Sequence, residues 1–247
     1  MQGVCSYDGG RCTEPAWEGS PKGLCICHEP GNGNDPEIAR LVWLVARERS
    51  GVAEPDFSGW HFPKDEEGFK GIEFAGSTKF VNAVFEGASR FQGAAFNDTV
   101  SFEGASFNGD ARFWHAVFQK DACFDRATFR GKVEFGGSRF AGNSLFRNAG
   151  FRQLGGFGGV MFEGPADFKD ASFRGPADFE AAVFKGNGVF EGVEFRKSAN
   201  FTRATFEGYL MFESAKFDGP PGFEGIIIIL GHSAVVGLDP SIRRLLP

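Results

Sequence analysis

The chain has little of what marks membrane, secreted or nucleic-acid-binding proteins. Its 247 residues contain no apolar run of eighteen or more residues, so we expect no membrane-spanning helix. Lys and Arg number 26 against 32 Asp and Glu, a net charge of −6, which leaves no basic excess for binding phosphates. We therefore expect no direct nucleic-acid ligand. The first residues, MQGVCSYDGGRC, have neither a charged nor an apolar signal region, and this start predicts a cytoplasmic protein.

Phenylalanine is abundant where the other aromatic residues are scarce: there are 31 Phe against 2 Tyr and 4 Trp. From Phe69 to Phe223, the spacing between consecutive phenylalanines alternates between five and six residues without exception. A helical period of about 3.6 residues does not match this spacing. The pattern instead predicts an internal repeat, in which each unit buries its phenylalanine by stacking on its neighbours.

Small residues and glycines accompany the phenylalanines at fixed positions. The residue two before each Phe is mostly small or β-branched, as at Ala83, Ala94 and Ala105. Positions two apart in an extended chain face the same side, so both residues are expected to point inward. Glycine stands two residues after Phe in 18 of the 31 cases, where a corner needs a positive φ or a close backbone approach.

Stretches such as FEGASF, FDRATF, FKDASF and FTRATF resemble pentapeptide repeats of the A-x-F type, over residues 57–225. The resemblance implies an all-β fold: a right-handed quadrilateral β-helix whose interior is filled by the Phe and the small residue two before it. Here every second repeat has one extra residue, which predicts a four-sided β-solenoid of about 22 residues per coil. A two-sided coil of about 11 residues is the alternative, but it has trouble enclosing a core about 10 Å thick.

Residues 1–34 differ in composition and form a separate module with four of the five cysteines. Cys5, Cys12, Cys25 and His28 give the spacing C-x6-C-x12-C-x2-H, and a segment this short has too little core to fold alone. A structural zinc ion with four protein ligands would supply the missing stability. Cys27 could replace His28 as the fourth ligand, and disulfides or free thiols are the other readings. The segment resembles small Cys3His zinc-binding heads that precede some pentapeptide-repeat domains.

Two further segments flank the repeats. Residues 35–56 predict a helix and linker, with Asp35 as N-cap, Pro36 at the first position and Gly51 past the end. An apolar stripe is expected to cover the open first coil, and it consists of Ile38, Leu41, Val42 and Val45. Residues 226–247 predict a C-terminal cap with a closing strand and a short helix, and a homodimer interface is the alternative for this segment.

The sequence offers no convergent set of acids, bases and nucleophiles, so we expect no enzyme. A rigid scaffold that presents solenoid faces to a protein partner fits best. The alternative is a DNA mimic that binds type II topoisomerase, as some pentapeptide-repeat proteins do. Mimicry needs a strongly negative surface, whereas residues 57–225 carry 22 acidic and 19 basic side chains.

Overall fold

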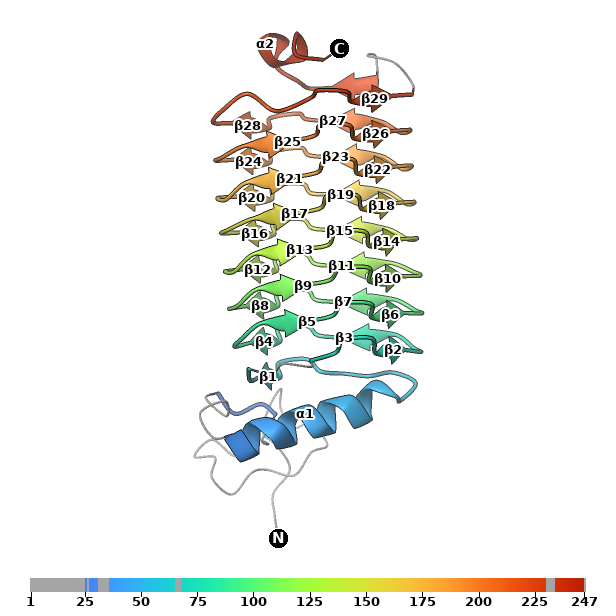
Figure 1. The fold of residues 1–247 in the computed structure, drawn as a ribbon, viewed down its shortest axis with the longest axis vertical. Helices are drawn as coiled ribbons and strands as arrows, with labels where there is room; N and C mark the ends of the chain where they lie inside the picture. The colour runs from blue at the N-terminus through green and yellow to red at the C-terminus, as the bar shows by residue number, and fades with distance from the viewer. Residues whose placement is uncertain (1–24, 26, 31–35, 65–67, 230–233, 247) are drawn as a thin grey trace.

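The chain folds into a four-walled rod of stacked coils (Figure 1). The computed structural model describes residues 25, 27–30, 36–64, 68–229 and 234–246. Strands are only two residues long because a corner interrupts the extended chain after every phenylalanine. We number the walls in the order in which the chain visits them within one coil.

Each wall is a parallel sheet that runs along the rod. Wall 1 contains β1 (His61–Phe62), β4 (Val84–Phe85), β8 (Ser106–Phe107), β12 (Thr128–Phe129), β16 (Gly150–Phe151), β20 (Ser172–Phe173), β24 (Glu194–Phe195) and β28 (Lys216–Phe217). Wall 2 contains β5 (Ser89–Arg90), β9 (Ala111–Arg112), β13 (Val133–Glu134), β17 (Gly155–Gly156), β21 (Ala177–Asp178) and β25 (Ala199–Asn200). Wall 3 contains β2 (Glu73–Phe74), β6 (Ala95–Phe96), β10 (Val117–Phe118), β14 (Arg139–Phe140), β18 (Met161–Phe162), β22 (Val183–Phe184), β26 (Thr205–Phe206) and β29 (Ile227–Ile228). Wall 4 contains β3 (Thr78–Lys79), β7 (Val100–Ser101), β11 (Ala122–Cys123), β15 (Ser144–Leu145), β19 (Ala166–Asp167), β23 (Gly188–Val189), β27 (Leu210–Met211) and β30 (Val235–Val236).

The strand register fixes the length of the coil. Phe85 of β4 lies opposite Phe107 of β8, and Phe118 of β10 lies opposite Phe140 of β14, a step of 22 residues in both cases. The predicted four-sided coil of about 22 residues is therefore confirmed, and the two-sided coil of half that length is wrong. Two opposed strands cannot enclose the phenylalanines, whereas four walls surround them.

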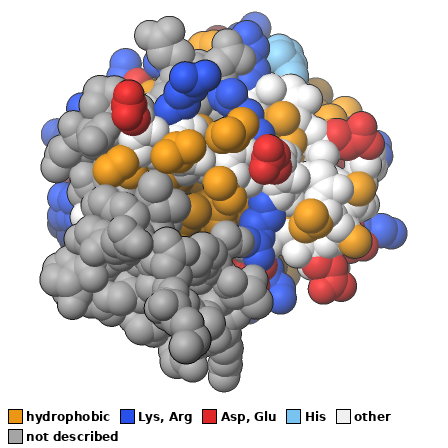
Figure 2. Space-filling view, turned by 90° about the horizontal axis from the view of Figure 1, so that it is seen from below, with side chains coloured by type: hydrophobic (Ala, Val, Ile, Leu, Met, Phe, Trp, Pro, Cys, Tyr) orange, Lys and Arg blue, Asp and Glu red, His pale blue; other side chains and the backbone are white. Residues whose placement is uncertain are grey.

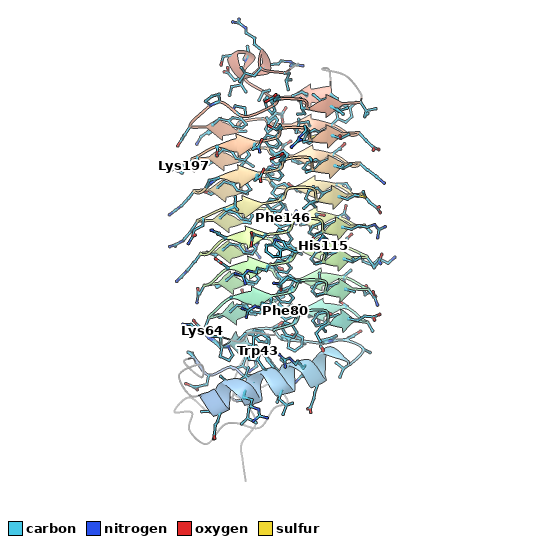
Figure 3. The ribbon with its side chains drawn as sticks, in the orientation of Figure 1. Trp43, Lys64, Phe80, His115, Phe146 and Lys197 are labelled. Atoms are coloured by element: carbon cyan, nitrogen blue, oxygen red, sulfur yellow. The ribbon has the colours of Figure 1, made fainter. Side chains whose placement is uncertain are left out.

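The phenylalanine rings fill the inside of the tube, as Phe80 and Phe146 show in Figure 3. All the phenylalanines except Phe217 are buried. Rings one coil apart stack nearly parallel: Phe124 lies 4.9 Å from Phe102 and 4.9 Å from Phe146, between ring centroids. Rings on opposite walls meet edge to face, as Phe124 and Phe135 do at 5.4 Å and 83°. Such pairs contribute about 0.5–1.5 kcal/mol each beyond the burial of their area.

The corners are of two kinds, and each explains one role expected for glycine. After the Phe of walls 2 and 4, the second residue has a positive φ, which is 66° at Gly93, 56° at His115 and 58° at Arg126. After walls 1 and 3, consecutive coils approach closely at the corner, so that a Cβ added to Gly109 would lie 2.5 Å from the carbonyl carbon of Gly87. The positive φ of Gly93 and the close backbone approach at Gly109 therefore occur at different kinds of corner.

Helix α1 (Pro36–Ser50) covers the first coil, in the range in which a helix is predicted. Trp43 packs with its ring centroid 5.2 Å from those of Phe62 and Phe69. Its indole Nε1 donates a hydrogen bond to the Pro63 carbonyl at 3.0 Å. Val42 and Trp43 are buried on the same face as Ala46, so the helix closes the end of the aromatic core.

The predicted stripe of α1 is partly wrong. Val42 is fully buried and Val45 packs on the core, as expected, but the Leu41 side chain is 48% exposed. Trp43 packs on the first coil, and residues two apart lie on opposite sides of a helix, so Leu41 faces outward. The end view in Figure 2 shows hydrophobic side chains among charged ones on this end of the rod. Asp35, the predicted N-cap, lies outside the described residues.

At the other end, the chain continues the walls after the phenylalanine series stops. β29 pairs with β26 and β30 pairs with β27, so both extend existing sheets by one strand. The short helix α2 (Pro240–Arg243) follows, and the Asp239 side chain caps it by accepting a hydrogen bond from the Ser241 backbone N–H. Among the described residues, neither helix has the length and apolar character needed to cross a bilayer.

Candidate functional site

The described part of the N-terminal module lies against the first coil. The Cys27 carbonyl accepts a hydrogen bond from the His61 backbone N–H at 2.7 Å, beside the first strand of wall 1. His28 Nε2 donates to the Ser58 carbonyl at 2.9 Å, and its ring meets Trp60 edge-on at 6.3 Å. The module therefore packs on the aromatic end of the solenoid at this point.

Two of the four predicted metal ligands are adjacent. Cys25 Sγ lies 3.0 Å from His28 Nδ1. Because a carbonyl only accepts, the Ser58 contact places the proton of the neutral ring on Nε2 and leaves a lone pair on Nδ1. This tautomer is the one in which Nδ1 can bind zinc while Nε2–H is held by a backbone carbonyl. Cys5 and Cys12 lie outside the described residues, and the described residues alone form no cluster of three potential ligands.

Cys27 also lies beside this pair. It is buried, and its side chain hydrogen-bonds with Cys25. That hydrogen bond, together with burial, raises the pKa of Cys25 to about 11, while His28 acts in the opposite direction. Without a metal the Cys25 thiol is therefore protonated at neutral pH, and a bound zinc ion would displace that proton. Both candidates for the fourth ligand, His28 and Cys27, contact Cys25.

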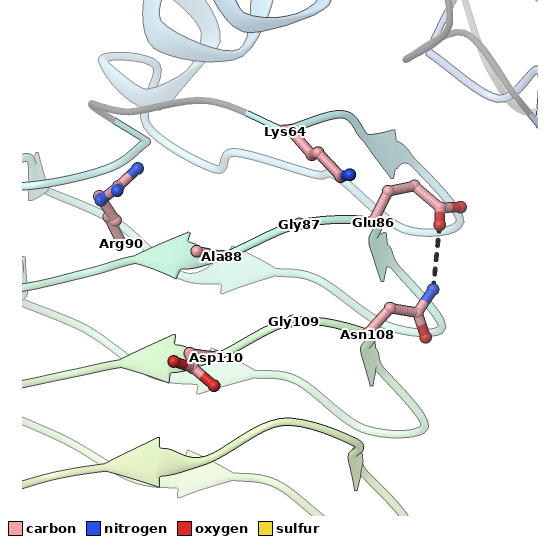
Figure 4. A pocket seen from close by; sticks show the side chains of 8 residues that line it. All are labelled: Lys64, Glu86, Gly87, Ala88, Arg90, Asn108, Gly109 and Asp110. Atoms are coloured by element: carbon pink, nitrogen blue, oxygen red, sulfur yellow. Dashed lines mark hydrogen bonds between the residues drawn. The ribbon is translucent and has the colours of Figure 1, made fainter.

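A hollow of about 590 Å³ lies at the corner between walls 1 and 2, near the N-terminal end of the rod (Figure 4). Two of its side chains are held by neighbours: Asn108 Nδ2 donates to Glu86 at 3.0 Å, and the Lys132 backbone N–H donates to Asp110 at 3.0 Å. His61 Nδ1 also lies 3.5 Å from Glu86. The eight residues that line the hollow are Lys64, Glu86, Gly87, Ala88, Arg90, Asn108, Gly109 and Asp110. No hydroxyl or thiol nucleophile is among these eight. The hollow therefore exposes both basic side chains (Lys64 and Arg90) and acidic side chains (Glu86 and Asp110).

The other histidines that the structure describes, His61 and His115, do not assemble a site. His61 lies at the rim of wall 1, where it contacts Glu86. His115 is exposed at a corner with positive φ, on the outside of the tube. His232 lies outside the described residues.

Acid–base pairs on the outer surface link successive coils. Arg147 Nη2 lies 2.6 Å from Asp125 Oδ2 in the preceding coil, and Arg139 Nη2 lies 2.7 Å from Glu163 Oε2 in the following coil. The Arg139 guanidinium lowers the pKa of Glu163. Further pairs across coils are Lys169–Glu191, Lys185–Glu163, Lys216–Glu194, Arg126–Glu103 and Arg203–Glu180. The walls therefore present a mixed surface.

These pairs were missed in the sequence because their partners lie a whole coil apart in the chain, at separations of 22 to 24 residues. The coil length could have revealed them. With 22 residues per coil, residues 22 apart in the sequence form one column of a wall, and their side chains lie one above the other. Arg147 and Asp125, one coil apart, then stand side by side. The lining of the hollow, by contrast, depends on how the first coil departs from this register, with Phe62 opposite Phe85.

Comparisons with known proteins agree with the repeat. A family model of pentapeptide repeats (9 copies) matches residues 69–117 and 157–205. One solved structure with similarity is HetL, a pentapeptide repeat protein involved in heterocyst differentiation regulation, from the cyanobacterium Nostoc sp. strain PCC 7120. The match has 14% identity and a TM-score of 0.20, and it covers 71% of this chain and 82% of HetL. No curated protein matches the chain in sequence. In the two matched stretches the chain is similar to pentapeptide repeats, and its fold is a four-walled parallel β-helix.

Proposed function

We propose that this protein is a non-enzymatic scaffold whose walls bind a protein partner. The observation that carries the proposal is that the phenylalanine rings fill the inside of the tube, while side chains that differ from coil to coil lie on its regular outer walls. Solenoids use such extended surfaces for recognition. The open hollow at the N-terminal corner has no hydroxyl or thiol nucleophile, which supports binding rather than catalysis there.

The charge distribution favours a scaffold over a DNA mimic. Mimicry needs a continuous acidic stripe along the rod. Between residues 84 and 219, no column of a wall carries acids in more than two successive coils, as at Glu191 and Glu213. Basic residues interrupt these columns, and several pair with the acids. We therefore expect no inhibition when the protein is added to a gyrase supercoiling assay.

The scaffold is tested by capture of a partner. The tagged full chain is cross-linked in its native cells, purified, and compared with variants in which exposed wall residues are reversed in charge. We expect a partner recovered in near-stoichiometric amount, and its loss in variants of one wall only. Recovery that does not depend on any wall, or no recovered partner, would contradict the proposal.

The C-terminal segment is included in the proposal as a homodimer contact. Ile227, Ile229 and Leu245 are exposed apolar side chains near this end of the rod. Light scattering after size exclusion measures the mass directly. If the segment joins two copies, replacing Ile227 and Ile229 by Lys converts a dimer to a monomer. We place the protein in the cytoplasm, which fluorescence imaging of a tagged chain tests.

A further inference from the structure

Four arginines occupy the same position in successive coils of wall 1. Arg130, Arg152, Arg174 and Arg196 each follow the phenylalanine of β12, β16, β20 and β24, one coil apart from each other. All four are exposed. The rings beneath them stack at centroid distances of 5.2, 4.3 and 5.3 Å, so the positions lie about one strand spacing apart. We call this set the arginine column.

Three members of the column have no acidic partner, unlike the other arginines of the same coils. All of residues 112–203 are described, and within them Arg130, Arg152 and Arg174 form no ion pair or side-chain hydrogen bond. The arginines in this range that do form an ion pair are Arg112, Arg126, Arg139, Arg147, Arg196 and Arg203. The unpaired ones thus lie in three consecutive coils of a single column.

The guanidinium groups of neighbouring coils repel one another, which is unfavourable in the protein without a bound ligand. The column is also bounded by neutral and acidic residues: Asn108 and Glu86 precede Arg130 in the two coils before it, and Asp218 follows Arg196 in the next coil. Figure 3 shows Lys64 and Lys197 on the edge of the rod along which the column runs. The arginine column itself is therefore confined to the middle coils of this edge.

The surface beside the column is nearly flat. The outward strand positions next to Arg130, Arg152 and Arg174 hold Thr128, Gly150 and Ser172, and Gly131 and Gly175 follow two of these arginines, whereas Glu194 stands beside Arg196 and pairs with it. Small residues on both sides let an extended chain approach the guanidinium groups closely. Arginine binds carboxylates with two parallel hydrogen bonds, which favours a ligand that carries several of them.

The length of the column favours a short peptide over a nucleic acid. Three intervals of about 4.8 Å give about 14 Å, which matches four or five residues of an extended peptide at about 3.3 Å per residue. A nucleic acid is charged along its whole length and would meet Glu86 or Asp218 beyond the ends. The column also has no aromatic side chain on which a base could stack.

We propose that the arginine column binds a short, extended, carboxylate-rich segment of a partner protein. The proposal rests on the proposed scaffold function and names the wall and the chemistry of its partner. Carboxylates from the partner would supply the acidic groups that the other arginines find in their own coils. Lys132 and Lys197, which are exposed beside the column, extend the positive surface.

The experiment uses fluorescein-labelled hexaglutamate as the probe and the full chain as the receptor. The test variant is Arg152→Glu with Arg174→Glu, and the matched control is Lys79→Glu with Lys120→Glu, which has the same net charge but changes walls 4 and 3. Both pairs are exposed. The test variant places acids between Arg130 and Arg196, so it is expected to melt no lower than the original protein.

We expect hexaglutamate to bind at about 50 mM salt and to dissociate at about 300 mM. The test variant should weaken binding by about tenfold or more, and the control by less than about twofold. Absence of binding at low salt, or equal weakening in both variants, would overturn the proposal. Tighter binding of a single-stranded oligothymidylate of equal charge, lost in the same test variant, would overturn the choice of a peptide.

The scaffold proposal and the arginine column can fail separately. If the original protein captures a partner that the test variant captures equally well, the column is not the binding surface and the scaffold function stands. If the original protein captures no partner, the scaffold function fails, and the hexaglutamate measurement still decides whether the column binds carboxylates.

Discussion

Arg147 holds the carboxylate of Asp125, its neighbour one coil earlier, with three donors. Its Nε and Nη2 lie 2.9 and 2.6 Å from Asp125 Oδ2, and its backbone N–H donates to Oδ1 at 2.9 Å. Asp125 is only 8% exposed. Arg152 stands at the same place in a repeat, one residue after a phenylalanine, but without an acid beside it. The same residue type therefore stabilises one wall and is available for binding on another.

Substituting these two arginines by glutamine should shift stability in opposite directions. Arg147→Gln leaves a nearly buried carboxylate without its charged partner, and we expect a loss of about 1–3 kcal/mol in the free energy of unfolding. Arg152→Gln removes repulsion within the arginine column, and we expect a gain of about 0.2–0.5 kcal/mol. Urea titration measures both. Equal losses would show that the column is paired in the folded protein.

Glycine is required at one type of corner and dispensable in one strand. A methyl group at Gly109 would meet the backbone of Gly87 at 2.5 Å, and only movement of the coils could relieve this. We expect Gly109→Ala to cost about 1–3 kcal/mol. Gly150 has nothing within 4 Å of an added Cβ, so Gly150→Ala should be stabilising by about 0.4–1 kcal/mol. Thermal melting compares the two, and a harmless Gly109→Ala would contradict the close stacking of coils.

Two carboxylates should respond to pH with opposite signs. Burial raises the pKa of Asp167, so the folded protein loses stability as pH rises from the unfolded value of about 3.9 through the raised folded one. Asp167→Asn keeps an oxygen that accepts from the Lys169 N–H, and we expect it to be more stable than the original protein at neutral pH.

The pKa of Glu163 is shifted in the opposite direction to that of Asp167. The Arg139 hydrogen bond lowers its pKa, so its contribution is present above the unfolded value of about 4.3 and is lost as pH falls through the lowered folded one. Glu163→Gln should therefore be less stable than the original protein at neutral pH. Both differences should shrink toward zero as pH falls below the folded and unfolded pKa values of each carboxylate. Denaturant titrations across pH measure them, and two differences of the same sign would refute the assignment.

Zinc in the N-terminal module is a separate prediction. Protein purified without chelator should contain one zinc ion per chain, and Cys12→Ser or Cys25→Ser should remove it. Cys123→Ser is the control, because Cys123 lies in β11, far along the chain from the module. A comparison of Cys27→Ser with His28→Ala identifies the fourth ligand, since only substitution of the true ligand should abolish zinc binding. Elemental analysis measures the zinc content of every variant. Less than one zinc ion per chain in the original protein would contradict the predicted site.

The fold could be predicted from the sequence to an unusual depth because one residue type sets the period. Phe and the small residue two before it, such as Phe85 and Ala83, both point inward as predicted. The four-sided coil could be predicted because a core of opposed rings is too thick for a coil of two sides. The orientation of the N-terminal helix could not be predicted, because Leu41 and Trp43 are both apolar and the sequence pattern alone does not decide which of them meets the coil.

The binding surface could not be predicted in the same way. Arg130 and Arg152 do not stand out among 26 Lys and Arg until the register of the coils places them in one column. Whether each arginine has an acidic partner depends on which residues lie one coil away and how far their side chains reach. Arg139, for example, reaches Glu163 of the next coil rather than the residue directly beside it in its own column.

The central claim is that the rings stack inside a closed tube with one coil every 22 residues. Nuclear Overhauser effects between phenylalanine ring protons, in protein labelled selectively at phenylalanine, test it most directly. We predict strong effects between Phe124 and both Phe102 and Phe146, whose ring centroids are 4.9 Å away. In a two-sided coil of half the length, these rings would lie two strand spacings apart, about 9.6 Å. Absence of these effects would contradict the account.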